Sequence, residues 1–157
     1  MKILIFSDSH RKWEHMVSAV ETEHPDAVIH LGDVVRDAEE LERRYPSLSF
    51  IKVRGNCDYD VFDLPEQRIL ELGGVRFLVA HGHRYGVKSG LLRYWMAARE
   101  NQVDVALFGH THCAYCEEKS GIYLLNPGSC GVGTRLSYGV VSILDKQPVC
   151  NVCMLEK

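Results

Sequence analysis

Five short apolar runs of this sequence end in residue types that ligate metal ions. Three of these run ends are Asp8-Ser9-His10, Gly32-Asp33 and Gly55-Asn56-Cys57-Asp58, and the other two are His81-Gly82-His83 and Gly109-His110-Thr111-His112. In open α/β sheets, ligands bind outside the carboxyl ends of the strands, so side chains far apart in the chain converge at one edge. The pattern therefore predicts one metal-binding edge.

The donor types and their spacing indicate which ions would bind there. Residues i and i+2 of an extended segment point to the same side, so Asp8 with His10, and His110 with His112, are expected to form chelating pairs. Carboxylate, imidazole and amide oxygen together suit a borderline divalent ion such as manganese, iron, nickel or zinc. Seven ligands are too many for one four-coordinate ion and favour two ions that share a carboxylate. The candidate ligands are Asp8, His10, Asp33, Asn56, His81, His110 and His112.

Each candidate has a simpler structural role when it is taken alone. A single aspartate at a strand end, such as Asp8 or Asp33, usually caps the following helix. A lone histidine such as His15 or His24 is usually a surface or core residue with its hydrogen bonds satisfied, and His30, inside a predicted strand, is a candidate support for the metal site. The metal prediction therefore depends on the whole set.

Apolar periodicity predicts the elements that would position these residues. Strands are expected at 2–7, 27–31 and 50–53, with a helix between the first two and a charged surface helix at 36–45, which together form a βαβαβ pattern. In the second half, 69–72 and 75–80 flank Gly73-Gly74, a two-residue hairpin signal. A helix around 91–98 then leads into a strand at 103–108. Four further strands are expected at 113–118, 121–125, 137–144 and 149–155.

Composition limits the class of protein. The chain has 157 residues, so we expect a single domain at 1–157, and 46% hydrophobic with 25% charged residues is ordinary for a globular protein. With 18 Lys and Arg against 21 Asp and Glu, the net charge is -3, and stable nucleic-acid binding is not expected. The first apolar run is too short for a signal peptide and no run could span a membrane, so a cytoplasmic protein is expected. The oligomeric state stays open.

The ordered run ends resemble the calcineurin-like metallophosphoesterase superfamily, whose pattern is D-x-H, G-D, G-N-[HC]-[DE], H and G-H-x-H. The match spans nearly the whole chain. The short length, the G-N-C-D variant and the turn from Asn126 to Ser129 are similar to the small phosphodiesterase branch, which also resembles the retromer metallophosphoesterase-like subunit. The resemblance implies a four-layer α/β/β/α sandwich, in agreement with the two sheets and outer helices expected from periodicity.

The resemblance also implies a ligand assignment and a reaction. One divalent ion would take Asp8, His10 and His112, the other would take Asn56, His81 and His110, and Asp33 would bridge them. Manganese is the expected metal, with iron, nickel, zinc or magnesium as alternatives. Such a pair clamps the attacking and leaving oxygens of an in-line displacement and lowers the pKa of a bridging water, so that a hydroxide attacks the phosphate ester.

Three further residues carry expectations for catalysis or substrate binding. Cys57 stands where many superfamily members have histidine; a thiol can donate a proton to the leaving group but never carries positive charge. Asp58 is a candidate for catalysis or for orienting its neighbours, and equally for a turn. Arg84 is a candidate for holding the substrate phosphate, although a solvated helix face is the simpler interpretation of this and the nearby basic residues. The expected ligand Asn56 is also a candidate for substrate binding, and Asn56 and Asp33 are expected to take part in catalysis.

The spacing of two cysteine pairs superficially suggests a structural zinc site. Cys113 with Cys116, and Cys150 with Cys153, each have ligand spacing. The second pair lies in a predicted strand, where its members would face opposite ways, so free thiols are favoured.

The function expected from the sequence is metal-dependent hydrolysis of a small-molecule phosphate ester by a phosphodiesterase. The alternative is a protein-interaction scaffold with weak or vestigial catalytic activity, and a DNA-repair type of nuclease is a third reading that the missing basic excess disfavours.

Overall fold

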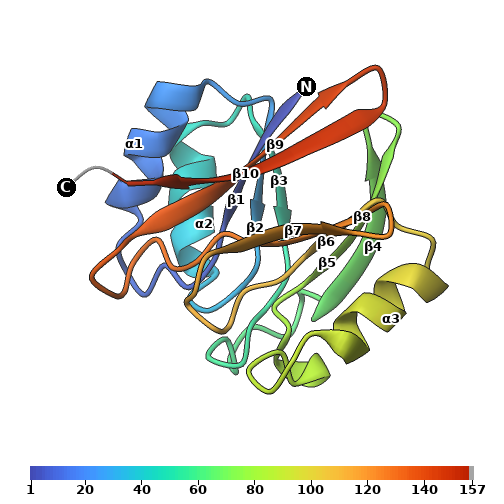
Figure 1. Ribbon diagram of the computed structural model, residues 1–157. Coiled ribbons are helices and arrows are strands. Elements are labelled where there is room, and N and C mark those ends of the chain that lie inside the picture. The colour runs from blue at the N-terminus through green and yellow to red at the C-terminus, as the bar shows by residue number, and fades with distance from the viewer. Residues whose placement is uncertain (156–157) are drawn as a thin grey trace.

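The computed structural model describes residues 1–155, which form two five-stranded sheets packed face to face with helices outside them (Figure 1). The first sheet has the strand order β10-β9-β1-β2-β3, in which β1, β2 and β3 are parallel to one another and β9 and β10 are antiparallel additions. The strands of this sheet are β1 (Lys2–Phe6), β2 (Ala27–His30), β3 (Ser49–Lys52), β9 (Ser137–Leu144) and β10 (Gln147–Met154).

The crossovers of the first sheet are the two expected helices, α1 (Glu14–Glu23) and α2 (Arg36–Arg44). Side chains alternate along β1, so Leu4 and Phe6 face outward and pack in the cluster that contains Met16 of α1 and Leu41 of α2. This cluster fixes both helices to the outer face of the sheet. The predicted βαβαβ pattern is confirmed.

The second sheet has the strand order β4-β5-β6-β8-β7. Its central strands β5, β6 and β8 are parallel, whereas the edge strands β4 and β7 are antiparallel to their neighbours. Gly73 and Gly74 join β4 to β5 with positive φ values of 58° and 78°, which is the backbone of a type I′ hairpin turn. The strands of this sheet are β4 (Gln67–Leu72), β5 (Val75–Ala80), β6 (Val105–Leu107), β7 (Tyr115–Lys119) and β8 (Ile122–Asn126).

Helix α3 (Leu92–Glu100) covers the outer face of the second sheet, where its Tyr94 and Ala98 pack with Leu78 of β5. A short 3-10 helix, η1 (His83–Tyr85), precedes it and was not expected from the sequence. With α1 and α2 on one side and α3 on the other, the four-layer α/β/β/α sandwich is confirmed (Figure 1). Among residues 1–155, no helix is long and apolar enough to cross a membrane.

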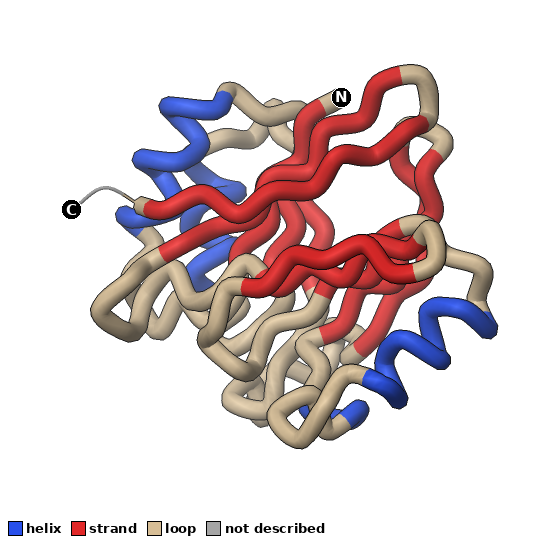
Figure 2. Tube along the Cα trace, in the orientation of Figure 1, coloured by secondary structure: helices blue, strands red, loops and turns tan. Residues whose placement is uncertain are grey.

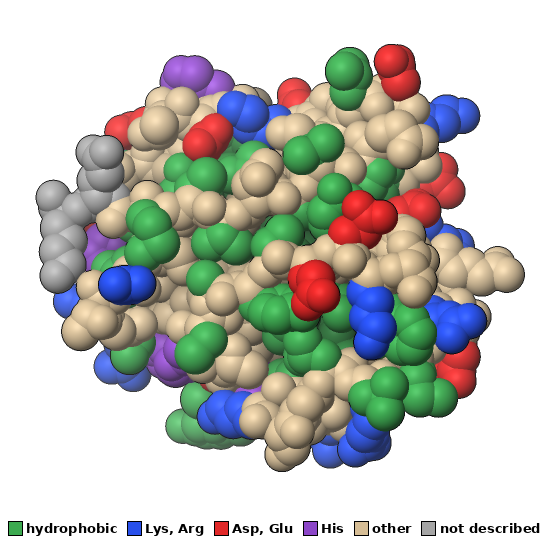
Figure 3. All heavy atoms as spheres, viewed as in Figure 1, with side chains coloured by type: hydrophobic (Ala, Val, Ile, Leu, Met, Phe, Trp, Pro, Cys, Tyr) green, Lys and Arg blue, Asp and Glu red, His purple; other side chains and the backbone are tan. Residues whose placement is uncertain are grey.

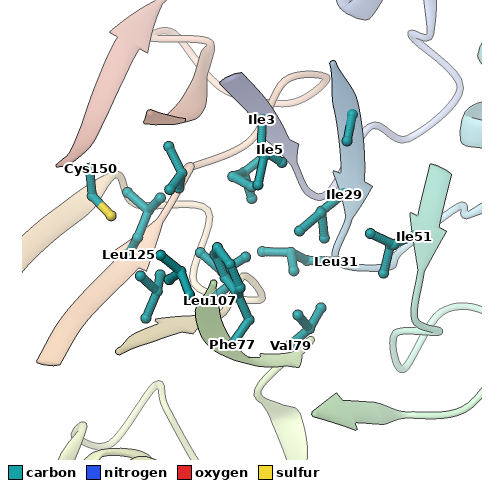
Figure 4. Close-up of a cluster of buried hydrophobic side chains, with 14 of the residues drawn as sticks. Ile3, Ile5, Ile29, Leu31, Ile51, Phe77, Val79, Leu107, Leu125 and Cys150 are labelled. Atoms are coloured by element: carbon teal, nitrogen blue, oxygen red, sulfur yellow. The ribbon is translucent and has the colours of Figure 1, made fainter. Parts of the chain in front are cut away.

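A continuous apolar core lies between the two sheets (Figure 4). Ile3 and Ile5 of β1 and Ile29 of β2 point into it from the first sheet, and Phe77 and Val79 of β5 point into it from the second. Because each of these residues is completely buried, their burial holds the sheets together and fixes the relative positions of the loops at the sheet ends.

The loops that carry the candidate ligands follow β1, β2, β3, β5 and β6, which are five of the six parallel strands of the two sheets. Figure 2 shows long loops gathered at the lower side of the view, beneath the strands. The ligand loops therefore meet as expected, because the parallel strands of each sheet end at the same edge.

Candidate metal centre

Two groups of metal-ligand side chains share one aspartate at this edge. In the first group, ligand atoms of Asp8, His10, Asp33 and His112 all lie within 4.8 Å of one another, and in the second group ligand atoms of Asp33, His81 and His110 do so. Asp33 belongs to both groups. Side chains from both sheets thus meet at one place, and the arrangement can hold two cations with a shared carboxylate.

The polar atoms of the first group fit a cation. Asp8 Oδ1 and His10 Nε2 are buried and have no hydrogen-bond partner among the described residues. His112 Nε2 lies 3.0 Å from the same Asp8 oxygen. A buried carboxylate oxygen and a buried imidazole nitrogen without partners are costly unless a ligand satisfies them. A divalent cation does so for both.

In the second group the hydrogen bonds select which histidine nitrogen faces the centre. His81 Nδ1 is 2.9 Å from the carbonyl oxygen of Leu31, which can only accept, so Nδ1 carries the proton. Nε2 faces Asp33 Oδ2 at 3.4 Å and His110 Nδ1 at 3.2 Å; it donates to Asp33 when the ring is protonated, and when the ring is neutral its lone pair is available to a cation. This outer hydrogen bond is the usual way to orient an imidazole ligand.

The backbone at the ligands differs from the extended geometry that the sequence suggested. Asp8, His10, Asp33, His110 and His112 have positive φ values between 44° and 68°. Non-glycine residues in this left-handed region are uncommon and strained, and they cluster at functional sites. The i, i+2 argument was therefore wrong in its reason, because these side chains converge through left-handed turns. His110 and His112 also join different groups.

Asp58 holds the loop that carries Asp33. Its Oδ2 accepts hydrogen bonds from the backbone N–H of Asp33 at 2.8 Å and of Gly55 at 2.8 Å, and its Oδ1 accepts one from Val35 at 2.9 Å. The residue is 3% exposed. Asp33 Oδ1 in turn accepts the N–H of Cys57 at 2.8 Å. Asp58 thus acts on the centre by positioning Asp33.

Three other polar residues fix the loop of Asp8, and the sequence analysis did not single out one of them, Ser7. Ser7 Oγ donates to Asp8 Oδ2, and the N–H of His110 donates to the same oxygen at 3.1 Å. Ser129 Oγ donates to the backbone carbonyl of Asp8 at 2.7 Å. A side chain at position 109 would collide with Ser7 Oγ at 2.0 Å, so Gly109 is required there. Ser7 bonds its own neighbour in the chain, whereas Ser129 bonds a residue 121 positions away, which no local pattern can reveal.

His30 supports the centre from inside the first sheet. Its Nδ1 accepts the N–H of Gly32 at 3.2 Å, which leaves the proton on Nε2, 3.1 Å from Ser9 Oγ. Burial lowers the pKa of His30 to about 4, so the ring is neutral at physiological pH. The neutral ring ties the loops after β1 and β2 together.

Asn126, at the end of β8, fixes the loop of His110 and His112. Its side-chain amide donates to the carbonyl of Gly109 at 3.0 Å and to Thr111 Oγ1 at 2.9 Å, and its oxygen accepts the N–H of Gly128 at 2.9 Å. The residue is completely buried. In the sequence, Asn126 was noted as part of the turn to Ser129 that resembles the small phosphodiesterase branch, and its role in holding this loop was not expected.

Asn56 and Cys57 lie at the exposed rim of the centre. The Asn56 amide lies 3.6 Å from Cys57 Sγ. Partial burial and the negative charge of Asp33 raise the pKa of Cys57 to about 11, so the thiol stays protonated at neutral pH. Cys57 can therefore donate a proton or a hydrogen bond, and it presents no thiolate.

Arg84 is engaged in an ion pair. Its Nε and Nη2 contact the two carboxylate oxygens of Glu66 at 2.9 and 3.2 Å, and its side chain is 71% exposed. Glu66 also faces Arg54 at 3.6 Å and His83 at 3.8 Å. The arginine that the sequence suggested for substrate binding thus has a carboxylate partner already.

Charge coupling sets the protonation of the shared ligand. Burial acts to raise the pKa of Asp33, but its hydrogen bond with His81, the charge of His81 and the Cys57 N–H together hold it well below the usual range. Burial and the charge of His81 lower the pKa of His110 to about 4. Asp33 is thus an ionised carboxylate and His110 a neutral imidazole, the forms that bind metals.

Cys113 follows the candidate ligand His112 and lines the same cleft as that histidine, but the cysteines of the two pairs belong to neither ligand group. Cys150 is buried between the sheets, whereas Cys153 packs on the helix side of the first sheet, so the two face opposite ways as expected. Cys116 Sγ donates to the carbonyl of Cys150 at 3.3 Å. Within residues 1–155, no cysteine belongs to a group of potential metal ligands.

Comparisons with known proteins agree with this geometry. Residues 1–146 match the family model described as the calcineurin-like phosphoesterase superfamily domain. A probable metallophosphoesterase of Bacillus subtilis is 39% identical over 132 residues, which cover 82% of this chain and 75% of the relative. A phosphodiesterase of Methanocaldococcus jannaschii is 29% identical over 168 residues and 94% of both chains.

Solved structures share the fold. A predicted phosphoesterase of Streptococcus pneumoniae superposes with a TM-score of 0.81 at 27% identity, covering 98% of this chain and 88% of its own. Vacuolar protein sorting 29 of Cryptosporidium parvum gives a TM-score of 0.76 at 17% identity, covering 99% and 98%. At that identity the second likeness concerns the fold alone.

Proposed function

The chain belongs to the calcineurin-like phosphoesterase superfamily, and we propose that it is a phosphodiesterase that hydrolyses small phosphate esters with two divalent metal ions. The observation that carries the proposal is the pair of ligand groups joined by Asp33. A single structural ion would need only one group. Two groups with a common carboxylate are the arrangement that in-line displacement at phosphorus uses.

The proposed assignment gives Asp8, His10 and His112 to one ion and His81 and His110 to the other. Asp33 bridges them, and Asn56 is the additional ligand of the second ion. We propose manganese as the metal, because the mixed carboxylate, imidazole and amide set suits such an ion. When bound, the ions supply Lewis-acid activation of the phosphate ester and of a water nucleophile.

The chain's own residues prepare the site for an anionic ester. Two divalent cations against the carboxylates of Asp8 and Asp33 leave a local charge of about +2, which attracts phosphate even though the whole chain carries -3. Cys57, protonated at neutral pH, is placed at the rim to donate to a leaving oxygen. As a thiol it offers no positive charge there, so esters with good leaving groups are the favoured substrates.

The overall charge of the chain favours a small-molecule substrate, because 18 Lys and Arg stand against 21 Asp and Glu. On the one face drawn in Figure 3, Lys and Arg side chains are interspersed with Asp and Glu and do not form one basic stripe. A nucleic-acid backbone is usually followed by such a stripe.

The alternative is an interaction scaffold with vestigial catalysis. It predicts weak metal binding and no turnover of any ester. Two observations support the hydrolase. Ligand residues are present in both groups, and the buried polar atoms of Asp8 and His10 have no hydrogen-bond partner among the described residues.

The test combines metal analysis of the purified protein with an activity screen. Phosphomonoesters, phosphodiesters and cyclic nucleotides would be assayed with Mn²⁺, Fe²⁺, Ni²⁺, Zn²⁺ and Mg²⁺. The proposal expects about two metal ions per chain and turnover of a diester. Asp33→Asn should abolish turnover and weaken the binding of both ions, whereas Asp63→Asn, at an exposed carboxylate outside the site, should change neither. Full activity of the Asp33 variant would show that the Asp33 carboxylate does not bridge two catalytic ions.

A further inference from the structure

A cleft of about 510 Å³ adjoins the candidate metal centre at His112. Its walls include Val132 and Arg135 of the loop between β8 and β9, and Met154 of β10. Val132 and Met154 are 44% and 52% exposed, so their apolar surface is available to a ligand. The volume lies within the usual range of small-molecule sites.

The wall of this cleft is fixed to the metal centre through Ser129. The hydroxyl of Ser129 accepts the N–H groups of Gly131 and Val132 at 3.2 and 2.8 Å, and donates to the carbonyl of the candidate ligand Asp8. A Cβ at Gly131 would lie 1.8 Å from the carbonyl oxygen of Ser9, so the loop root is pressed against the Asp8 loop. The root of the loop that forms this wall is therefore anchored to the loop that carries Asp8.

The charge of the cleft matches an anion. Among the lining residues that the structure describes, Arg135 is the only one that is a lysine, arginine, aspartate or glutamate. A smaller cleft of about 260 Å³ beside Cys57 differs, because its arginines are accompanied by three aspartates, and Arg36 is paired with Asp60 at 2.7 Å. An anionic group thus fits the cleft at His112 and not the one at Cys57.

We propose that this cleft binds the non-leaving organic group of the diester, that Arg135 pairs with a second anionic group on it, and that Val132 and Met154 contact its apolar part. The inference rests on the proposed function and specifies its substrate as a phosphodiester that carries an additional phosphate or carboxylate. The metal centre supplies the charge for the scissile phosphate. Arg135 is a separate cation for the second anion, and a guanidinium suits planar, two-point pairing with either group.

Two esters with the same leaving group test the proposal. Thymidine 5′-(p-nitrophenyl phosphate) and its 3′-phosphorylated derivative differ only in one additional anionic group. We expect the wild-type protein with Mn²⁺ to hydrolyse the 3′-phosphorylated ester with a kcat/KM roughly tenfold higher, through a lower KM, because one charge-assisted contact is gained. Equilibrium binding of thymidine 3′,5′-bisphosphate against thymidine 5′-phosphate provides a second readout that needs no turnover.

Arg135→Gln should abolish this preference in both readouts and leave kcat on the unphosphorylated ester unchanged, and Arg135→Lys should restore part of it. Arg36→Gln, at the other cleft, is the matched control and should keep the full preference. Equal KM values for the two esters in the wild-type protein, or a preference that survives Arg135→Gln, would overturn the proposal. If neither ester is hydrolysed with any metal, the proposed function fails, and the binding ratio still decides the role of Arg135.

Discussion

The three backbone hydrogen bonds that Asp58 accepts make Asp58→Asn the most informative single substitution. The amide of asparagine has one oxygen, so it can replace Oδ2 towards Asp33 and Gly55, but its NH₂ group then faces the N–H of Val35. An unsatisfied buried N–H costs about 1–3 kcal/mol, and the loss of charge weakens each remaining bond by about 1 kcal/mol. The free energy of unfolding should therefore fall by about 3–5 kcal/mol.

Urea and thermal unfolding measure this loss directly. For a chain of this size 1 kcal/mol corresponds to roughly 2–4 °C, so the midpoint should fall by about 6–20 °C. Metal affinity should also fall roughly 10- to 100-fold, because the backbone that carries Asp33 is no longer held. Asp60→Asn is the control: Asp60 is exposed and paired with Arg36, and its loss should cost less than about 1 kcal/mol. If the Asp58 variant matched the Asp60 variant in both stability and metal affinity, the positioning role would be refuted.

Three further outcomes are expected. Cys57→His should raise kcat on phosphomonoesters roughly tenfold or more, because an imidazolium adds positive charge and a better proton donor at the leaving group; a metal-loaded variant without any gain contradicts this. For His30, the pKa falls from 6.5 in the unfolded chain to about 4 in the folded protein. Between these two pKa values the unfolded state binds a proton that the folded state does not. The free energy of unfolding therefore falls by about 3 kcal/mol as the pH is lowered from 6.5 to about 4. His30→Gln should flatten the pH dependence of urea unfolding in EDTA by that amount, and an unchanged slope would rule out the buried neutral ring. Finally, Mn²⁺ at 100 times its Kd should stabilise the wild-type protein by about 2.7 kcal/mol, reversibly with chelator, and Asp33→Asn should remove most of this gain in calorimetry.

The architecture could be predicted because its signals are local. Short apolar runs, helical spacing from Trp13 to Val20, and the Gly73-Gly74 turn each depend on near neighbours in the chain, and the structure has the corresponding elements within a few residues. The 3-10 helix η1 was missed because such short helices have no periodicity to detect.

Within the site, the sequence determined which residue types stand at the strand ends. It could not determine how their backbones turn. Val34 with φ of 64° shows this clearly, because no branched side chain favours that conformation and only the surrounding contacts impose it. The ion pair of Arg84 with Glu66 was equally hidden, since it depends on a partner from the other side of the β4–β5 hairpin.

The sequence by itself determined the fold class and the set of candidate ligands, because strand, turn and donor types are properties of short segments. Only the tertiary structure decided that Asp33 is common to both ligand groups, that Asp58, Ser129 and Asn126 hold the ligand loops, and that Arg135 shares a cleft with His112. These relations join residues up to 121 positions apart, as in the bond from Ser129 to Asp8. Such contacts form only when the packing of the two sheets brings the strand ends together.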